Sequence, residues 1–460
     1  MRNKISFFLV VVLVLSLPAC KTYSPGLVKP SSRQLAYQQL EQVGFIHFTV
    51  NTFTNKEWGY GDEDPAIFNP TELDAEQWVL AAKAGGLKEL ILTAKHHDGF
   101  CLWPSEYTEH CIKNSPYKDG KGDIVGEFVA ACRKHGLKVG LYLSPWDRNH
   151  ADYGSPAYID YFRNQLRELL TRYGEINEIW FDGANGGDGY YGGANETREV
   201  DKKSYYDWPH TVALVKDLQP GIKIFSDAGP DLRWVGNEHG FAGETFWSTI
   251  DSSQLFIGAS DPEYLNTGEP WGNCWIIGQC DVSIRPGWFY HADEDSLVKT
   301  PEELIDIYYK SVGRNAVLLL NLPPDRRGLI HETDVAHLAT FRSILDETFA
   351  KDLAAGAELE ESRTEDCHWI YDLILPGESA FDRIEIREDI SKGQRVSRFR
   401  IELPSEGDWK TITSGTTIGY KRLLRTDLYS CRSLRLVIED ALAEPQGITI
   451  SLYRSSEREP

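Results

Sequence analysis

The stretch NEIWFDGANG carries an apolar run directly into a carboxylate. Residues 179–181 have the aromatic and aliphatic character of a buried strand, and Asp182 follows them before a Gly/Asn turn. An aspartate in this position is most often a turn residue, because Asp and Asn side chains accept hydrogen bonds from nearby backbone groups. It can also be a catalytic carboxylate at the end of a barrel strand. Other parts of the chain must distinguish the two interpretations.

Histidines, aromatic rings and carboxylates recur where other apolar runs end. Taken singly, each has an ordinary interpretation as a core or solvated turn residue. Neighbouring side chains such as those of His96 and His97 point in opposite directions in an extended chain, so both serve one ligand only where the chain bends. Their coincidence at strand ends nevertheless favours one site. The candidates are His47, Glu57, Trp58, His96, His97, Tyr142, Asp182, Glu238 and Trp288.

Two carboxylates among neutral groups that bind hydroxyls predict glycoside hydrolysis. One carboxylate attacks the anomeric carbon, and a second, held protonated, gives its proton to the leaving oxygen. Asp182, among the polar donors of its turn, is the candidate for the ionised group. Glu238 is the candidate for the protonated group, because partial burial beside Trp234 would favour its neutral form, and Glu244 is its rival. Retention would require the two carboxyls to lie about 5 to 5.5 Å apart.

Other chemistries have weaker support. The sequence contains no glycine-rich phosphate loop, no GxSxG serine motif and no dinucleotide fingerprint. A barrel-type metallohydrolase using His47, His96 and His97 is an alternative, but the first strand has no HxH pair. We therefore expect no metal and no cofactor. The net charge of −21 argues against nucleic acid or an anionic membrane surface as a partner.

Strands alternate with helices from about residue 35 onward, which predicts parallel strand pairing. Continuous apolar runs such as GLKVGLYLS and AVLLLNLPP are typical of strands buried on both faces. These features predict an α/β fold, a (β/α)8-like barrel over residues 35–350, in which functional groups gather at the carboxyl ends of the strands. The predicted strands are 43–50, 89–94, 138–143, 178–181, 223–226, 275–280 and 316–320. The predicted helices are 73–84, 124–135, 158–173 and 300–312.

The pattern changes from residue 351. Short alternating apolar and polar runs, separated by Gly, Ser and charged turns, predict a C-terminal antiparallel β-sandwich over residues 351–460. It contains no cluster of titratable groups that resembles a site. A structural cap on the barrel is therefore favoured over a sugar-binding module.

Residues 1–20 have the form of a bacterial secretory signal. Arg2 and Lys4 precede the apolar run ISFFLVVVLVLSL, and LPAC follows. LPAC resembles a lipobox, which predicts lipidation of Cys20 and a periplasmic or outer-membrane-anchored lipoprotein of a Gram-negative bacterium; an ordinary signal peptide is the alternative. No other segment reaches the roughly 18 to 20 apolar residues of a membrane span.

Seven cysteines follow Cys20. An exported chain can form disulfides, and the nearest pairs are Cys101–Cys111 and Cys274–Cys280. Buried free thiols are the favoured interpretation for both pairs.

Several motifs together resemble the α-L-fucosidases of glycoside hydrolase family 29. They are FIHFTVNTF, KEWGYG, LTAKHHDGFCLWPS, KVGLYLSPWDRN, EIWFDGANG and RWVGNEHG, and they span about residues 40–325. The resemblance implies a retaining exo-hydrolase that combines a barrel with a C-terminal β-sandwich and uses no metal. A non-catalytic fucose-binding protein on the same fold is the alternative.

The resemblance also implies roles for individual residues. Asp182, at the WFDG position, is implied as the nucleophile, and Glu238 of GNE as the acid/base. The GNE motif after PDLRW resembles the branch that prefers α-1,3/1,4-linked fucose on branched, Lewis-type glycans. Arg285 is a further candidate for contact with the ligand, but the resemblance assigns it no role. The groups implied to bind fucose are His47, Glu57, Trp58, His96, His97, Tyr142 and Trp288, the last of these packing against the methyl face of the sugar.

Overall fold

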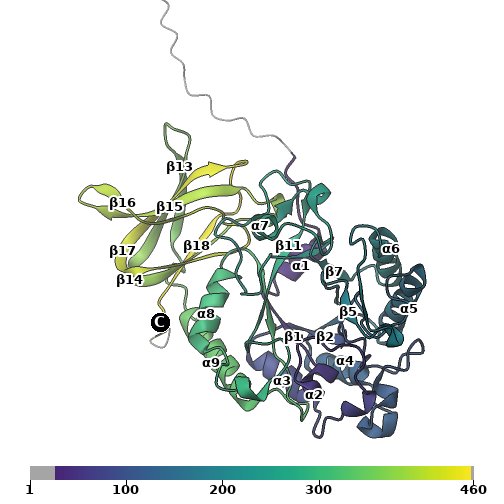
Figure 1. The fold of residues 1–460 in the computed structure, drawn as a ribbon. Helices are drawn as coiled ribbons and strands as arrows, with labels where there is room; N and C mark the ends of the chain where they lie inside the picture. Colours follow the sequence, from purple (N-terminus) through teal and green to yellow (C-terminus); the bar gives the residue numbers. More distant parts are fainter. Residues whose placement is uncertain (1–25, 457–460) are drawn as a thin grey trace, which may run out of the picture.

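The computed structural model describes residues 26–456, which form a parallel β-barrel followed by an antiparallel β domain (Figure 1). This arrangement confirms the predicted fold class. The predicted signal segment and Cys20 lie outside the described residues. Within residues 26–456, no helix is both long enough and apolar enough to cross a membrane.

Parallel strands close the barrel. In the order in which they pair, they are β1 (Gln42–Ile46), β12 (Val317–Asn321), β11 (Ile277–Ser283), β8 (Leu232–Trp234), β7 (Lys223–Ser226), β4 (Glu178–Trp180), β3 (Lys138–Leu143) and β2 (Glu89–Lys95). These strands are almost entirely buried, because helices cover their outer face and side chains fill the barrel, and this explains the continuous apolar runs in the sequence. The sequence predicts seven of them and misses β8.

β8 is missed because it is short and follows a Gly-Pro turn. Only residues 227–231 separate it from β7, although parallel neighbours are usually joined by a much longer crossover. Asp231 holds this tight connection together, since its carboxylate accepts a hydrogen bond from the backbone N–H of Ile224 at 2.9 Å.

The predicted strand 275–280 begins too early and ends too soon. Cys274–Trp275 is a separate strand, β10, which pairs antiparallel with β9 (Thr249–Ile250). The barrel strand β11 begins at Ile277 and continues to Ser283. This extension places Asp281 and Ser283 inside the barrel strand, where the sequence pattern had placed a loop.

Helices cover the outside of the barrel, and the predicted helix start at Thr300 is confirmed by a capping box between Thr300 and Glu303. The helices are α1 (Ser32–Gln38), α2 (Val50–Thr54), α3 (Ala75–Ala84), α4 (Ile124–His135), α5 (Pro156–Arg172), α6 (Trp208–Leu218), α7 (Pro262–Thr267), α8 (Pro301–Lys310) and α9 (Glu332–Thr348). A small hairpin, β5 (Gly187–Gly189) and β6 (Glu196–Arg198), follows β4.

Aromatic rings fill the middle of the barrel. The Trp180 ring lies parallel to that of Phe225, with centroids 4.0 Å apart, and Tyr142 stacks on its other side at 5.3 Å. At the amino ends of the strands, α1 closes the barrel, and the Tyr37 hydroxyl donates a hydrogen bond to Glu178 at 2.6 Å. The ring layer thus forms an apolar floor beneath the carboxyl ends of the strands.

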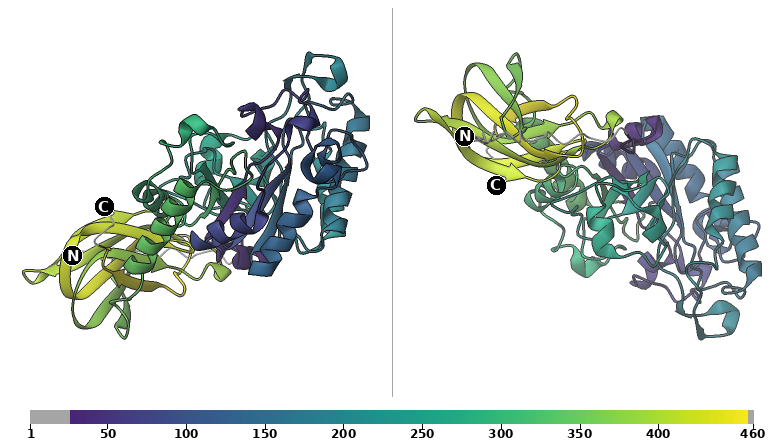
Figure 2. Two further views of the ribbon diagram at one scale, coloured as in Figure 1. Left: turned by 90° about the horizontal axis from the view of Figure 1, so that it is seen from below. Right: turned by 90° about the horizontal axis from the view of Figure 1, so that it is seen from above.

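The C-terminal domain is a six-stranded antiparallel sheet with its own apolar core, lying beside α8 and α9 (Figures 1 and 2). Its strands are β13 (Glu358–Arg363), β14 (Trp369–Arg387), β15 (Val396–Ser405), β16 (Asp408–Gly415), β17 (Arg422–Ala441) and β18 (Thr449–Tyr453). The long pairing of β14 with β17 contains register shifts, which let the sheet bend over its core.

This domain is bonded to one barrel segment in particular, residues 244–248. The carboxylate of Glu244 pairs with Arg422, and its carbonyl accepts a hydrogen bond from the same guanidinium at 2.9 Å. The backbone N–H of Phe246 donates to Thr417 at 3.0 Å, and that of Ser248 donates to Gln394 at 2.9 Å. The barrel segment that follows Glu238 is therefore held by side chains of the other domain.

The two nearest cysteine pairs are not bridged. Within the part of the chain that the structure describes, Cys101, Cys111, Cys274 and Cys280 are free thiols. This confirms buried free thiols for Cys101, Cys111 and Cys280, whereas Cys274 is free but only partly buried.

Candidate active site

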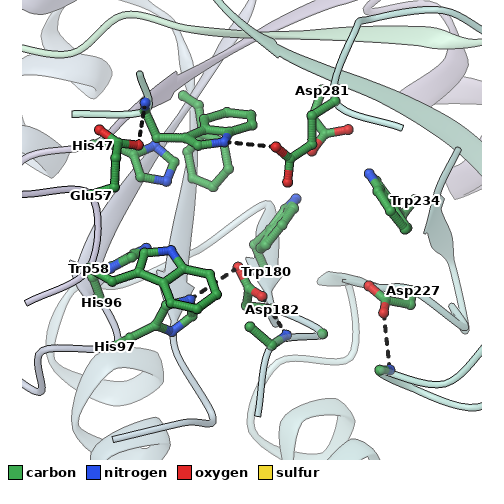
Figure 3. A pocket seen from close by; sticks show the side chains of 16 residues that line it. His47, Glu57, Trp58, His96, His97, Trp180, Asp182, Asp227, Trp234 and Asp281 are labelled. Carbon is green, nitrogen blue, oxygen red and sulfur yellow. Dashed lines mark hydrogen bonds and ion pairs between the residues drawn. The ribbon is translucent and has the colours of Figure 1, made fainter. Parts of the chain in front are cut away.

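A cavity of about 250 Å³ opens at the carboxyl ends of the barrel strands (Figure 3). This is the end at which barrel enzymes carry their functional groups. In Figure 3, His47, Glu57, Trp58, His96 and His97 lie on one side of Asp182, and Asp227 and Trp234 lie on the other. The lining residues are Phe45, His47, Glu57, Trp58, His96, His97, Trp180, Asp182, Gly183, Ala184, Asp227, Trp234, Glu238, Gly258, Asp281 and Trp288.

Asp182 stands directly above the aromatic floor, one residue beyond Phe181. Its carboxylate accepts hydrogen bonds from the Ala184 N–H at 2.7 Å and from the Tyr142 hydroxyl at 3.1 Å. Burial raises the pKa of Asp182, and these two donors oppose the rise. Asp182 therefore makes a turn contact, through its bond to Ala184, and also lines the cavity, as the catalytic interpretation requires.

Glu238 reaches the cavity from the loop that follows β8. The indole N–H of Trp288 donates to its carboxylate at 3.2 Å. The rival Glu244 does not line the cavity, and its carboxylate forms ion pairs with Arg314 at 2.7 Å and with Arg422. Glu238 therefore lines the same cavity as Asp182, and Glu244 does not.

The three histidines are buried and neutral. Burial lowers the pKa of His47 and of His97 to about 3 each, and that of His96 well below its usual value. The Nδ1 atom of His47 lies 2.8 Å from the amide oxygen of Asn321, and the Nδ1 atom of His97 lies 2.7 Å from the Ser144 hydroxyl. The other ring nitrogen of His97, Nε2, faces Asp182 and lies 3.9 Å from its Oδ2.

The chain bends at the end of β2, so that His96 and His97 both line the cavity, with ring centroids 4.1 Å apart. The pairing of β2 with β3 shifts register between Thr93 and Lys95. Lys95 therefore points outward, where its buried ammonium bonds Asp147 at 3.0 Å. Burial, the largest single effect, would raise the pKa of Asp147, but the charge of Lys95, the charge of His150 and the hydrogen bonds from both residues together lower it. This buried ion pair holds Lys95 in place and so stabilises the bend at the end of β2.

Glu57 and Trp288 lie next to each other in the wall of the cavity. The carboxylate of Glu57 accepts hydrogen bonds from the backbone N–H groups of Trp288 and Phe289, at 2.7 and 3.1 Å. The Trp288 ring lies 5.1 Å from that of His47. Trp58 is 52% exposed at the rim, with its edge against the His97 ring. An exposed, oriented indole of this kind provides a flat apolar face for a sugar.

Two sequence candidates lie outside the cavity lining. Tyr142 is buried beneath it and acts through its hydrogen bond to Asp182; burial and the Asp182 charge raise its pKa, so it stays a hydroxyl donor. Arg285 is buried elsewhere, in ion pairs with Asp334 and Asp295, each at 2.8 Å. Arg285 therefore has no contact with the site.

Asp227 and Asp281 line the cavity, and the sequence interpretation missed both. Asp227 directly follows β7, and Asp182 follows β4 by two residues, so the position of Asp227 after a strand was an available signal. An added Cβ on Gly183 would lie 2.0 Å from its carboxylate, which explains the glycine after the Asp182 position. Burial, together with the charge of Asp182, raises the pKa of Asp227 to about 7. Asp281 was hidden by the misplaced end of β11.

Metal coordination has no matching geometry in the described part of the chain. Within residues 26–456, no three or more His, Cys, Asp or Glu side chains are grouped as metal ligands would be. The cavity instead combines carboxylates, neutral hydrogen-bonding rings and apolar faces. These are the groups that bind a sugar ring and cleave its glycosidic bond, so the fold and cavity define a barrel-type glycoside hydrolase.

Comparison with known proteins identifies the family. The α-L-fucosidase family model matches residues 30–347. Alpha-L-fucosidase 1 of Arabidopsis thaliana is 42% identical over 495 aligned residues, which cover 98% of this chain and 94% of that protein.

Solved structures agree. A glycoside hydrolase 29 family member from an unknown rumen bacterium is 45% identical, with a TM-score of 0.89 over 94% of this chain and 78% of that one. A Ruminococcus gnavus GH29 fucosidase in complex with fucose is 31% identical, with a TM-score of 0.82 over 95% and 97% of the two chains. The chain belongs to the α-L-fucosidases of glycoside hydrolase family 29, and its reaction releases fucose.

Proposed function

We propose that this α-L-fucosidase acts with retention of configuration, by double displacement, on terminal fucose. The observation that supports this most directly is that Asp182 and Glu238 face one cavity while every histidine around them is neutral. The cavity, at about 250 Å³, is smaller than a typical ligand pocket of 300 to 1,000 Å³, and so suits one sugar ring at a chain end.

In the first step, an oxygen of Asp182 attacks the anomeric carbon of fucose while Glu238 gives its proton to the departing glycosidic oxygen. The bond to the leaving sugar breaks, and a covalent fucosyl-Asp182 ester forms. In the second step, the Glu238 carboxylate takes a proton from water, and the oxygen of that water displaces Asp182. His47, His96, His97 and Glu57 hold the fucose hydroxyls, and Trp58 and Trp288 contact its apolar faces.

A non-catalytic fucose-binding protein is not favoured. Both carboxylates are retained in the cavity, and the chain belongs to a family of hydrolases. No step of the proposed reaction needs a metal or a cofactor.

We propose α-1,3/1,4-linked fucose on branched, Lewis-type glycans as the preferred substrate. The support is the PDLRW…GNE segment, which resembles that branch of the family and which forms β8 and the Glu238 loop. With α-1,2-, α-1,3- and α-1,4-fucosylated oligosaccharides assayed side by side, fucose release from the α-1,3 and α-1,4 isomers is expected to exceed that from the α-1,2 isomer by at least about tenfold, a difference of 1.4 kcal/mol in transition-state binding. A preference for the α-1,2 isomer would refute the branch assignment and leave the family intact.

We propose further that the chain is exported and anchored through a lipidated Cys20, on the sequence of residues 1–20 alone. Detergent-phase partitioning of the protein expressed with its own N-terminus is expected for wild type and lost for Cys20→Ala. Equal partitioning of the two would favour an ordinary signal peptide.

A further inference from the structure

The contacts of His97 show which of its ring nitrogens carries the hydrogen. Burial lowers the pKa of His97 to about 3, and the charges of Arg148 and Lys95 act in the same direction, so the ring is neutral. A neutral imidazole has one N–H donor and one acceptor nitrogen. Nδ1 lies 2.7 Å from the Ser144 hydroxyl, and Nε2 lies 3.9 Å from Oδ2 of Asp182. The position of the ring hydrogen therefore decides whether Asp182 faces a donor or an acceptor.

Ser144, the buried residue that directly follows β3, determines this position because its own hydrogen is already used. Its Oγ lies 2.6 Å from the carbonyl oxygen of Trp146. A carbonyl oxygen can only accept, so the hydroxyl hydrogen lies between these two oxygens. The Tyr142 hydroxyl, which also interacts with Ser144, donates its hydrogen to Asp182 at 3.1 Å. The Ser144 oxygen therefore accepts from His97, whose hydrogen must be on Nδ1.

His47 has its hydrogen on the same nitrogen, held by a different partner. Its Nδ1 lies 2.8 Å from Oδ1 of Asn321. The amide nitrogen of Asn321 donates to the Trp288 carbonyl at 2.8 Å and to the Ser283 hydroxyl at 2.9 Å, which fixes the orientation of the amide. Oδ1 of Asn321 can only accept, so Nδ1 of His47 is the donor. Because Ser144 takes no part in this contact, His47 is an internal reference for experiments on His97.

With its hydrogen on Nδ1, His97 presents a lone pair to Asp182, and two acceptors form no hydrogen bond with each other. Within residues 26–456, the hydrogen bonds to Asp182 come from the Ala184 N–H and the Tyr142 hydroxyl. A third donor would stabilise the ionised carboxylate. That stabilisation would weaken as the carboxylate loses its charge in attacking carbon, and so would slow the attack. The lone pair on Nε2 instead suits a hydroxyl that donates.

We propose that Ser144 is a positioning residue of the reaction, because by accepting a hydrogen bond from Nδ1 of His97 it keeps the ring hydrogen away from Asp182. Asp182 is then not held by a third donor, and Nε2 of His97 stays an acceptor for a hydroxyl of the sugar. Ser144 does not line the cavity and acts through His97 alone. The inference rests on the proposed role of Asp182 as nucleophile.

The first experiment is nitrogen-15 NMR of the free enzyme with labelled histidine at neutral pH, in which protonated and unprotonated ring nitrogens have distinct shifts. The signals of the two rings are assigned by their loss in His97→Gln and His47→Gln. In wild type, both rings are expected to carry hydrogen on Nδ1. In Ser144→Ala, Nδ1 of His97 has lost its acceptor, so the hydrogen is expected to move to Nε2, toward the Asp182 carboxylate, while the His47 signals stay unchanged.

Two outcomes of this experiment would overturn the proposal. One is a wild-type spectrum with the hydrogen of His97 on Nε2, which is decisive even if Ser144→Ala does not fold. The other is a folded Ser144→Ala in which the hydrogen stays on Nδ1. The spectrum is recorded without substrate, so it does not depend on which residue attacks the sugar.

The second experiment measures kcat on a fucosylated trisaccharide. Ser144→Ala is expected to lower kcat by about tenfold or more, the effect of one hydrogen bond to a charged group. Ser311→Ala is the matched control, since Ser311 is also buried and its hydroxyl donates to the Ile307 carbonyl at 2.7 Å, outside the cavity lining. An unchanged kcat in Ser144→Ala, or an equal loss in both variants, would overturn the proposal. Full turnover in Asp182→Ala would instead count against the proposed nucleophile and leave the NMR result intact.

Discussion

Asp182→Ala is expected to lose essentially all turnover, with kcat lowered by roughly 10⁴-fold or more, the scale on which removing one member of a catalytic set acts. Without the carboxylate no fucosyl-enzyme can form, and water has no alternative route to the anomeric carbon. Release of fucose from a fucosylated trisaccharide measures the loss directly. The cavity itself should survive, because the hydrogen-bonding contacts of the Nδ1 atoms of His47 and His97, with Asn321 and Ser144, do not involve Asp182.

Added azide separates a nucleophile from a binding residue in this variant. Azide fits the space that the carboxylate vacates, attacks the same face of the sugar and is expected to give a fucosyl azide of inverted configuration, identified by NMR. The exposed Asp217 on α6 provides the matched control, since Asp217→Ala removes an aspartate far from the cavity. Near-wild-type activity in Asp182→Ala, or an azide product of retained configuration, would contradict the assignment.

Glu238→Gln is expected to reduce kcat on natural glycans by about 10²- to 10⁴-fold, the usual contribution of a general acid. The glutamine has the same shape and can still accept a hydrogen bond from Trp288, but it has no proton to give to a sugar leaving group. Fucosyl fluoride needs little protonation as it leaves, so its first step should be much less affected. The measurement is the ratio of activity on the glycan to activity on fucosyl fluoride, in wild type and in Glu238→Gln. A lower ratio in the variant shows that the proton is no longer given to the leaving group.

Glu244→Gln is the control for this second prediction. Glu244 lies six residues further along the chain, but it pairs with Arg314 and Arg422 outside the cavity. Its replacement should lower thermal stability and leave the glycan-to-fluoride ratio unchanged. A large fall of that ratio in Glu244→Gln, with no change in Glu238→Gln, would identify Glu244 and not Glu238 as the general acid.

Most of the fold could be predicted because its signals are local. Continuous apolar strands and striped helices such as α4 and α5 can be recognised in a short window of sequence, and so the alternation and the barrel followed from it, although α6 and α9 were not predicted. β8 was not predicted, because a strand of three residues shortly after a proline is too short to show a periodic pattern. The end of β11 was not predicted either, because an aspartate after an apolar run is typical of the start of a loop. Its place inside a strand makes sense only once the barrel interior is known to contain a polar cavity.

The site was predictable to the extent that it lies at strand ends. His47, Asp182 and Glu57 could be proposed from position and residue type, whereas the pairing of His96 with His97 depends on a register shift that only the structure shows. Asp227 follows a strand, which was an available signal, but Asp281 lies inside one. That these two residues share a cavity with Asp182 depends on the closed barrel, which the sequence does not show.

The contacts between Glu244–Ser248 and the C-terminal domain have a consequence for how this chain can be divided. The segment that leads away from Glu238 is fastened by Thr417, Gln394 and Arg422, all of which belong to the sheet domain. A barrel cut off near residue 350 would keep every cavity residue and lose the side chains that hold the segment after Glu238. We therefore expect both domains to be needed for activity. A shortened fucosidase without the C-terminal domain would need other contacts to hold residues 244–248.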